Sequence, residues 1–463
     1  MTLDPAATET YRLIATRRNA TEILLSSQGS DWALPRVEIR KFRRIAEQLT
    51  AEARKGWEVE TCCLLVPRSQ IPGPDAGIPC ALLECAKNNQ KAPAGTYWMP
   101  VDVASQCSSA EEAAVIRKTF AELHLYASGE KPGPFAKPGW LRELFQWTHE
   151  QIAPLGLRLT GEFRQYNASP TFSLIRLETT DGAIWFKATG EPNAHELPVT
   201  LLLARLFPNH LPRILGVHTA WNGWLSAEAE GTALDELTEF SAWERAAEAL
   251  AELQIESIGK SRELVDGKCK EMRLPEVEKV IGPFLARMSE FMRVQEKTSP
   301  APLIRSELAS LGEGLRDSLS LLQSLRLPDT LGHLDCNPGN FVISPEKCVF
   351  LDWAEACVTS PVVSFEYLRR HMQRSRVQEP AADSRIIAAY VRPWVSLFSA
   401  EDLHRAITAV PPVAVFIHAV AGGTWRTLDP LVNQSLAGYF RALTRRMYRD
   451  AVVAAERSER CLS

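Results

Sequence analysis

The alternation of apolar and polar residues changes character along this chain, and the changes predict where strands and helices lie. Segments 157–163, 171–179 and 183–188 alternate with a period of two, as the strands of an antiparallel sheet do. The last two are joined by Asp181-Gly182, a sequence typical of a tight hairpin. Later segments repeat apolar residues at helical spacing, which predicts amphipathic helices: 240–255, 274–294, 306–325, 361–372, 386–398, 411–421 and 436–456.

The first hundred residues predict a separate α+β unit, with strands at 11–15, 22–25 and 58–66. An amphipathic helix is expected over 41–55, ended by Gly56. In the order of its elements the segment resembles a Nudix domain. Nudix hydrolases hold Mg²⁺ with clustered helix glutamates, whereas Arg54, Ala53 and Thr50 stand at those places here. We expect a Nudix-like shell without a hydrolase site, or else an unrelated α+β fold.

Residues 129–139 are rich in proline and glycine and are predicted to be a linker. Helices are expected before it, at 111–128, and after it, at 140–155. The predicted fold class is α+β. The predicted regions are a Nudix-like domain at 1–130, a linker with a lead-in helix at 131–156, a sheet-rich region at 157–232 and a helical region at 233–463.

The most informative stretch is 331–356, where His333, Asp335 and Asn340 follow the spacing H-x-D-x-x-x-x-N. Two short apolar runs around a proline-containing turn come next and predict a hairpin that ends just before Asp352. A hairpin places the residues before its first strand beside those after its second. Asp335, Asn340 and Asp352 are therefore expected together, as in phosphoryl-transfer sites. The alternative is a simple polar turn, because Asp, Asn, Pro and Gly are also the usual turn formers.

With this motif the chain, over about residues 140–449, resembles the aminoglycoside phosphotransferase and choline kinase family of small-molecule kinases. The family loop usually reads His-Gly-Asp, and Leu334 replaces that glycine. The resemblance implies a bilobal protein-kinase-like domain, with an antiparallel-sheet N-lobe at 157–232 and a mainly helical C-lobe at 233–463. It also implies ATP and Mg²⁺ as cofactors, and transfer of the γ-phosphate to a hydroxyl of a small molecule such as an aminoglycoside, an amino alcohol or a sugar.

The resemblance also assigns roles to the motif residues. Asp335 is expected to accept the proton of the acceptor hydroxyl, Asn340 and Asp352 to bind Mg²⁺, and His333 to brace the loop. Lys187, at the end of a predicted strand, is expected to hold the nucleotide phosphates. Glu196, at the start of the following helix, would orient that lysine, with Glu191 as a rival.

Further nucleotide contacts are expected from backbone groups and one loop. The loop 165–170 would cover the phosphates; it has no glycine, so Ser169 and Asn167 would offer polar groups instead. An ordinary polar hairpin loop is the alternative. The Ala227 carbonyl and the Ala229 N–H are expected to face the purine. Acidic residues would suit a cationic acceptor, and Glu355 and Glu366 are candidates.

The amino-acid composition narrows the class of protein and its expected location. The chain has 463 residues, 45% hydrophobic and 23% charged, as a soluble globular protein does. A net charge of −4 gives no general attraction to nucleic acid or membrane. The ten cysteines form no C-x-x-C pair, and no apolar run reaches the length of a membrane span, so a cytoplasmic protein with reduced thiols is expected.

One alternative function belongs to a different class. A pseudokinase that binds nucleotide or docks another protein would share this fold without catalysis. Leu334 and the glycine-free loop favour that alternative. The retained Lys187, Asp335, Asn340 and Asp352 favour the enzyme.

Overall fold

The computed structural model describes residues 7–28, 31–67, 77–375, 377 and 379–462. The chain divides into two compact units. Unit 1 comprises Met1–Leu197 and Arg213–Glu228, and unit 2 comprises Pro198–Pro212 and Ala229–Ser463.

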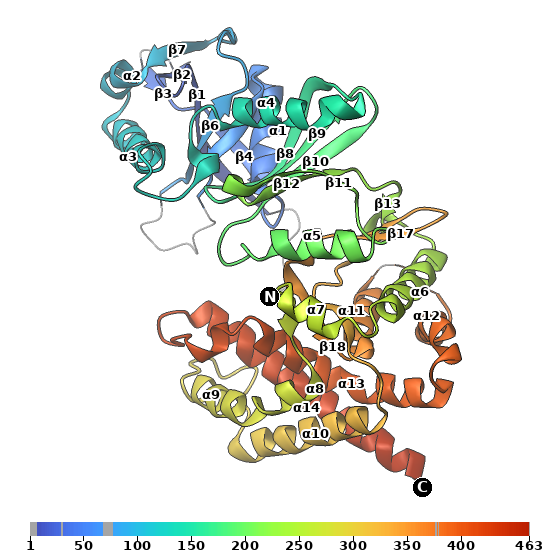
Figure 1. Cartoon of the computed structure of the whole chain (residues 1–463). Coiled ribbons are helices and arrows are strands. Elements are labelled where there is room, and N and C mark those ends of the chain that lie inside the picture. The colour runs from blue at the N-terminus through green and yellow to red at the C-terminus, as the bar shows by residue number, and fades with distance from the viewer. Residues whose placement is uncertain (1–6, 29–30, 68–76, 376, 378, 463) are drawn as a thin grey trace. The chain divides into compact units, whose positions relative to one another are not determined.

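The first part of unit 1 is a seven-stranded mixed sheet, blue in Figure 1. Its strands are β1 (Thr8–Arg17), β2 (Glu22–Gln28), β3 (Asp31–Ala33), β4 (Arg36–Arg40), β5 (Thr61–Leu65), β6 (Cys80–Cys85) and β7 (Thr96–Pro100). The order is β3-β2-β1-β6-β5, with β4 also paired to β1 and β7 to β2. β1 and β6 are parallel. Helices α1 (Ile45–Trp57), α2 (Val101–Cys107) and α3 (Ala110–Ala127) complete this α+β part.

Helix α1 differs at both ends from the helix predicted over 41–55. It begins at Ile45 and continues through Gly56 to Trp57, where Glu58 ends it in the left-handed conformation, with a φ of 53°. The Glu58 N–H reaches the carbonyls of the last turn, so an ordinary residue takes the place expected of glycine. Leu49 and Ala53 are buried against the sheet.

The likeness of this part to a Nudix domain stays a prediction, as does the lack of a hydrolase site. Among the residues that the structure describes, no group of three or more His, Cys, Asp or Glu side chains is placed to hold a metal ion.

The second part of unit 1 is a five-stranded antiparallel sheet with the order β11-β12-β10-β9-β8. Its strands are β8 (Leu159–Ser169), β9 (Phe172–Thr179), β10 (Ala183–Ala188), β11 (Ile214–His218) and β12 (Gly223–Ala227). Gly182 has a φ of 81° in the predicted turn between β9 and β10. Helix α4 (Trp140–Ile152) leads into the sheet through η2 (Ala153–Leu155), and η3 (Thr219–Trp221) joins β11 to β12. The predicted antiparallel N-lobe is confirmed.

One hydrophobic core runs through both sheets of unit 1. It combines buried side chains of the first sheet, such as Ile14 and Leu82, with Phe163 and Phe186 of the second. Residues 129–139, predicted to be a linker, contain η1 (Pro134–Ala136), and Phe135 is 1% exposed. The Phe135 ring lies 6.1 Å from that of Phe186. This segment is therefore part of the packing between the sheets.

A buried glutamine also joins the two sheets. The Gln165 side chain on β8 is 1% exposed, and its Oε1 accepts a hydrogen bond of 2.7 Å from the backbone N–H of Cys63. Its Nε2 donates to the Cys63 carbonyl at 3.4 Å. β5 is an edge strand of the first sheet, so the amide satisfies backbone groups that an edge leaves without a neighbouring strand.

Replacing Gln165 with alanine is expected to destabilise the protein by about 1–3 kcal/mol, because two buried backbone groups of Cys63 lose their partner. Chemical denaturation followed by tryptophan fluorescence measures this. Gln146→Ala is the control, since Gln146 lies exposed on α4 and is expected to change stability by less than about 0.5 kcal/mol. Equal effects of the two substitutions would contradict the structural role of Gln165.

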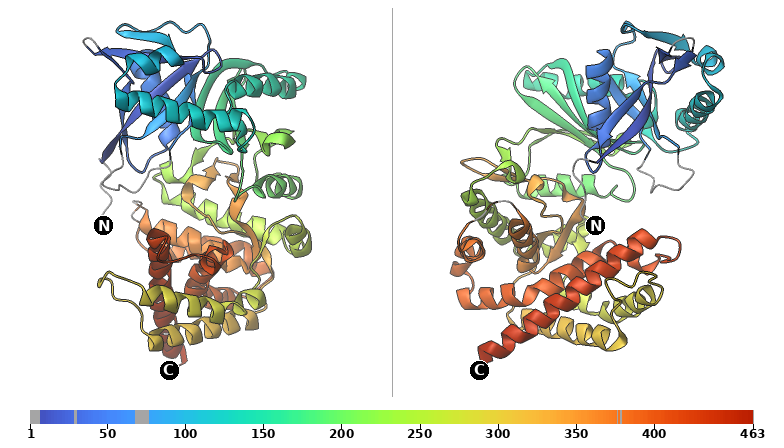
Figure 2. Two further views of the ribbon diagram at one scale, coloured as in Figure 1. Left: turned by 90° about the vertical axis from the view of Figure 1, so that its left-hand side faces the viewer. Right: turned by 180° about the vertical axis from the view of Figure 1, so that it is seen from behind.

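Unit 2 is mainly helical, as predicted for the C-lobe. Its longer helices are α6 (Phe240–Glu256), α9 (Ile281–Arg293), α10 (Arg305–Ser324), α11 (Pro361–Arg374), α12 (Ala382–Val391), α13 (Ala400–Ala421) and α14 (Gln434–Leu462). Helix α5 (Glu196–Leu206) begins in unit 1 and continues into unit 2. Helices α10, α13 and α14 pack against one another, as both views of Figure 2 show.

Shorter elements complete unit 2. The helical ones are η4 (Leu234–Glu236), α7 (Ser261–Asp266), α8 (Leu274–Glu278), η5 (Pro338–Asn340), η6 (Trp353–Glu355), η7 (Arg392–Ser396) and η8 (Thr424–Arg426). One small sheet has the order β13-β16-β17, formed by β13 (Thr232–Ala233), β16 (Phe341–Ile343) and β17 (Cys348–Phe350). The other has the order β14-β18-β15, formed by β14 (Lys270–Glu271), β18 (Ala356–Thr359) and β15 (Thr330–His333).

Helix α13 is longer than the helix predicted over 411–421. It begins at Ala400 and contains Pro411 and Pro412 in its interior. With 22 residues and a mean hydropathy of 1.4 in its most apolar window, it is long and apolar enough to cross a membrane, which the sequence reading did not anticipate. That window is 78% buried within the fold, as in the core helix of a soluble protein.

Candidate active site

The predicted hairpin brings the motif residues of unit 2 together. Phe341 of β16 lies opposite Phe350 of β17, and the Leu351 N–H donates to the Asn340 carbonyl at 2.8 Å. The Asn340 side chain turns back to the loop, where its Nδ2 donates to the Asp335 carbonyl at 3.0 Å and to Asp335 Oδ2 at 3.3 Å. Asp352 follows Leu351 directly, so the chain segments that carry the three residues meet at one end of the hairpin.

Asp352 adopts an uncommon backbone conformation. Its φ is 62°, in the left-handed region, which non-glycine residues rarely enter and which Asp and Asn tolerate best. The chain turns there from β17 into η6. The Asp335 and Asp352 side chains are both exposed to solvent.

His333 supports this loop from inside. It is 1% exposed, and its Nε2 lies 2.9 Å from the Leu351 carbonyl while its Nδ1 accepts a hydrogen bond from the Asp335 N–H at 3.2 Å. This pairing assigns the proton to Nε2. Burial lowers the pKa of His333, so the ring is neutral at pH 7. A neutral ring that bonds to both sides of the hairpin agrees with the predicted brace.

Leu334 is accommodated without strain. Its side chain is buried in the core of unit 2, and its N–H donates to the Glu355 carbonyl at 3.2 Å. Leu334 is not among the described residues with positive φ, so this position does not require the glycine usual in the family. Ser364, which the sequence reading missed, accepts a hydrogen bond from the His333 N–H at 2.8 Å. Its place in the first turn of a helix after Pro361 gave no specific signal.

The predicted lysine–glutamate pair is present in unit 1. Lys187 lies on β10, and its Nζ is 2.5 Å from Oε1 of Glu196, the first residue of α5. The Lys187 and Glu196 side chains are 14% and 2% exposed, so the pair is largely shielded from water. Glu196, and not the rival Glu191, is the carboxylate that meets Lys187.

The predicted phosphate-covering loop is shorter than expected. β8 continues through Asn167 to Ser169, paired with β9, which leaves only residues 170–171 as the turn. The prediction of a six-residue loop at 165–170 was therefore wrong, because strand pairing continues through these residues. Ser169 lies at the end of the strand, opposite Phe172. The Pro170 carbonyl accepts a hydrogen bond from Phe135 N–H at 3.1 Å, which ties the turn to η1.

The segment whose backbone is expected to face the purine coincides with the change from one unit to the other along the sequence. Ala227 ends β12 opposite Ile184, and unit 2 resumes at Ala229. Between them Glu228 accepts hydrogen bonds from Arg176 Nε at 2.7 Å and Trp185 Nε1 at 3.1 Å. Contact of Ala227 and Ala229 with a purine stays a prediction.

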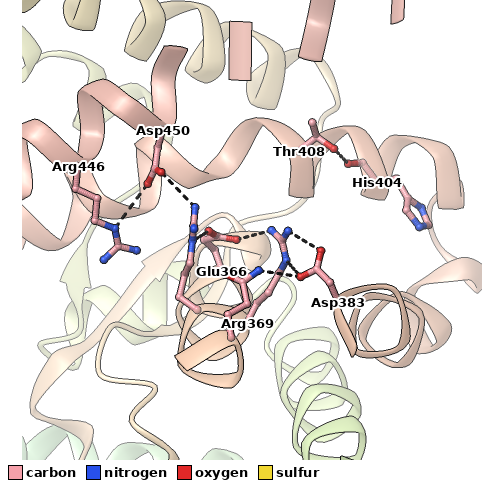
Figure 3. A network of polar contacts seen from close by, with 9 residues as sticks. Glu366, Arg369, Asp383, His404, Thr408, Arg446 and Asp450 are labelled. Atoms are coloured by element: carbon pink, nitrogen blue, oxygen red, sulfur yellow. Dashed lines mark hydrogen bonds and ion pairs between the residues drawn. The ribbon is translucent and has the colours of Figure 1, made fainter. Parts of the chain in front are cut away.

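The two carboxylates considered for a cationic acceptor are already paired. Glu355 lies 2.5 Å from Lys270 Nζ. Glu366 is 1% exposed and bonds to Arg369 at 2.9 Å and to Arg370 at 2.5 Å, within the network of Figure 3. The Glu366 carboxylate is therefore fully engaged, whereas the Glu355 side chain is 39% exposed and its ion pair with Lys270 uses Oε2 alone.

A comparison with protein families matches the part of the chain that holds the motif residues of unit 2. Residues 193–398 match the model of the phosphotransferase enzyme family. The matched segment contains the whole His333–Asp352 site. The family predicted from the sequence is confirmed, and with it the prediction of a small-molecule kinase.

Solved structures similar to this chain include an ethanolamine kinase from Plasmodium vivax, with 14% identity and a TM-score of 0.44, covering 65% of this chain and 85% of that one. A choline/ethanolamine kinase family protein from Mesorhizobium loti has 16% identity and a TM-score of 0.44, covering 67% and 94%. A macrolide 2'-phosphotransferase from Brachybacterium faecium has 16% identity and a TM-score of 0.43, covering 62% and 96%. No curated protein matches the chain.

Proposed function

We propose that this protein moves the γ-phosphate of ATP to a hydroxyl group of a small molecule. The observation that carries the proposal is the contact of Asn340 with Asp335, together with the backbone bond that holds Leu351, and so Asp352, next to Asn340. Two carboxylates and an amide that meet at one hairpin end suit metal-assisted phosphoryl transfer.

The residues of unit 2 have different chemical roles in this proposal. Asp335 accepts the proton of the acceptor hydroxyl as the phosphate arrives. Asn340 and Asp352 offer the oxygen ligands that Mg²⁺ prefers, and this ion commonly keeps water and phosphate oxygens as its other ligands. Because Asn340 Nδ2 donates to Asp335, the amide oxygen is the atom that would meet the ion. Bound Mg²⁺ would neutralise charge on the transferring phosphate.

The residues of unit 1 serve the nucleotide. Lys187, held by Glu196, binds the phosphates as the strand lysine of kinases does. Ser169 contributes a hydroxyl at the β8–β9 turn, and the backbone of Ala227 and Ala229 binds the purine. A cytoplasmic location agrees with the use of ATP.

The pseudokinase alternative loses one of its two supports. Leu334 is packed in the core while its N–H donates to the Glu355 carbonyl, so the loop keeps its backbone bond with leucine in place of glycine. The glycine-free turn remains, but the two-residue turn at 170–171 is set by strand pairing and not by glycine.

The test is transfer of phosphate from ATP, with Mg²⁺, to a panel of hydroxylated metabolites, followed by ADP formation. Asp335→Asn keeps the size and hydrogen bonds of the side chain but removes the base, and at least a hundredfold loss of kcat is expected. Asp317→Asn, an exposed change on α10, is the control and is expected to leave kcat unchanged. Stabilisation by Mg-ATP without turnover of any acceptor would favour the pseudokinase.

A further inference from the structure

Three helices of unit 2 form a surface rich in arginine, histidine and tyrosine beside the catalytic loop. We call this surface the basic face. It comprises Tyr367, His371 and Arg374 of α11, His418 of α13, and Tyr439 and Arg446 of α14.

The geometry of α11 ties the basic face to the loop of Asp335. Ser364 on this helix accepts a hydrogen bond from the His333 N–H at 2.8 Å. His371 lies seven residues after Ser364, on the same side of the helix, and Tyr367 and Arg374 lie close to that side. The α11 part of the basic face therefore leads away from the catalytic loop along one side of the helix.

Contacts between the helices join the other residues to it. His418 Nε2 lies 2.7 Å from the Tyr439 hydroxyl, and the rings of Tyr367 and His418 are 5.9 Å apart. Arg446 lies seven residues after Tyr439, again on the same side of α14. Figure 3 shows Arg446 reaching Asp450, with its Nε 3.7 Å from the Asp450 carboxylate.

Asp335 lies within electrostatic reach of this surface. Burial lowers the pKa of His371; Arg374 and Arg446 lower it further, while Asp335 acts in the opposite sense. Burial also lowers the pKa of His418, and Glu355 and Asp335 oppose that effect. Both imidazoles are therefore neutral at pH 7 and sense the charge of Asp335 together with that of Arg446.

Ion pairs neutralise the arginines of the basic face only in part. Asp450 is shared by Arg446 and by Arg370, which lies 3.4 Å from it. Among the residues that the structure describes, no carboxylate forms an ion pair with the exposed Arg374. Burial lowers the pKa of Arg446, and Arg374 is the next cause, as two nearby cations require.

We propose that the basic face binds an anionic group of the acceptor, a carboxylate or a phosphate, so that the acceptor is a hydroxylated anion. This inference rests on the proposed function and names its substrate class. Arginine side chains bind carboxylates and phosphates through paired N–H groups, and the His371 ring and the His418–Tyr439 pair can add a hydrogen bond. The Tyr367 hydroxyl already donates to the Ala414 carbonyl, so this side chain contributes shape and not a donor. An ammonium acceptor would meet Arg374 and Arg446 with like charge, while Glu355 and Glu366 are already paired.

The first test measures binding without chemistry. The full chain with ADP and Mg²⁺ is titrated with glycerate, glycerol 3-phosphate, glycerol and 2-aminopropane-1,3-diol, and binding is followed by saturation-transfer NMR. These probes share a three-carbon polyol and differ in charge. We expect at least one anion to bind at least tenfold more tightly than the neutral and cationic probes, and the better anion distinguishes carboxylate from phosphate. Equal binding of all four, preference for the amine, or no anion binding overturns the inference.

Substitutions test whether the anion binds at the basic face. Arg446→Gln and Arg374→Gln are each expected to weaken anion binding at least tenfold. Arg374 is exposed and has no ion pair within the described chain, so its variant tests the surface even if Arg446→Gln unfolds. Arg316→Gln, an exposed change on α10, is the control. Anion binding that survives both basic-face substitutions overturns the proposed location.

Failure of the inference and failure of the proposed function give different results. If anions bind at the basic face but no phosphate is transferred to any hydroxylated acceptor, only the proposed function fails. If phosphate is transferred preferentially to cationic acceptors, the function stands and the anionic substrate class is wrong. With a reactive anionic acceptor, Arg374→Gln is expected to raise its KM at least tenfold while the KM for ATP is unchanged.

Discussion

Replacing Lys187 with alanine is expected to lower kcat/KM about a thousandfold, which corresponds to about 4 kcal/mol of transition-state stabilisation. The Lys187 ammonium is largely shielded from water and is held 2.5 Å from Glu196 at the end of a core strand. The substitution would therefore remove a cation that the fold holds in position for the negative charge of the transferring phosphates. Steady-state kinetics with ATP and the first acceptor found in the panel provide the measurement.

The controls for this prediction separate catalysis from folding. Lys187→Ala leaves the buried Glu196 without this partner, so thermal unfolding must confirm that the variant is folded at the assay temperature. Lys118→Ala removes an exposed lysine on α3 and is expected to change kcat/KM by less than about 0.5 kcal/mol. Near-normal kinetics of Lys187→Ala would remove the proposed phosphate-binding role of this lysine.

The second large effect is a difference between two aspartates. Asp352→Ala is expected to weaken Mg-ATP binding at least a hundredfold, about 2.7 kcal/mol, because a carboxylate ligand of the ion is lost. Asp335→Ala is expected to preserve binding, because an aspartate that receives the acceptor proton is not needed to hold the metal. Calorimetric titration with ATP and Mg²⁺ compares the two variants directly.

Each result of this comparison assigns a role. If both variants lose binding equally, the division of roles between Asp335 and Asp352 is wrong. If Asp335→Ala alone loses binding, the metal-binding carboxylate is Asp335. Omitting Mg²⁺ from the titration is the matched control, since the difference between the variants is expected to disappear without it.

The motif residues were predictable because their positions depend on local chain geometry. Asp335, Asn340 and Asp352 meet through one short hairpin, whose turn and two apolar runs are visible in the sequence. The pair of Lys187 with Glu196 joins the end of a strand to the start of the next helix, which is also a short connection. The periodicity of apolar residues was sufficient to predict most strands and helices of both units, because most of these elements have one clear buried face.

The errors in the prediction arise from contacts between distant parts of the chain. Pairing with β9 extends β8 through the expected loop, and the bond of Gln165 to Cys63 joins segments about a hundred residues apart. The burial of Phe135 depends on both sheets of unit 1. The pairing of Glu366 was readable, because Arg369 and Arg370 follow it at the i+3 and i+4 positions.

The core shared by the two sheets of unit 1 has a consequence for how this protein can be divided or regulated. A protein cut after residue 129 would separate Ile14 and Leu82 from Phe163 and Phe186, so each fragment would expose apolar surface to water. The two sheets are expected to unfold in one transition. By linkage, a molecule that binds only the first sheet at a hundredfold excess over its Kd would stabilise the second by about 2.7 kcal/mol. A cellular ligand of the N-terminal α+β part would therefore raise the amount of folded enzyme without binding at its active site.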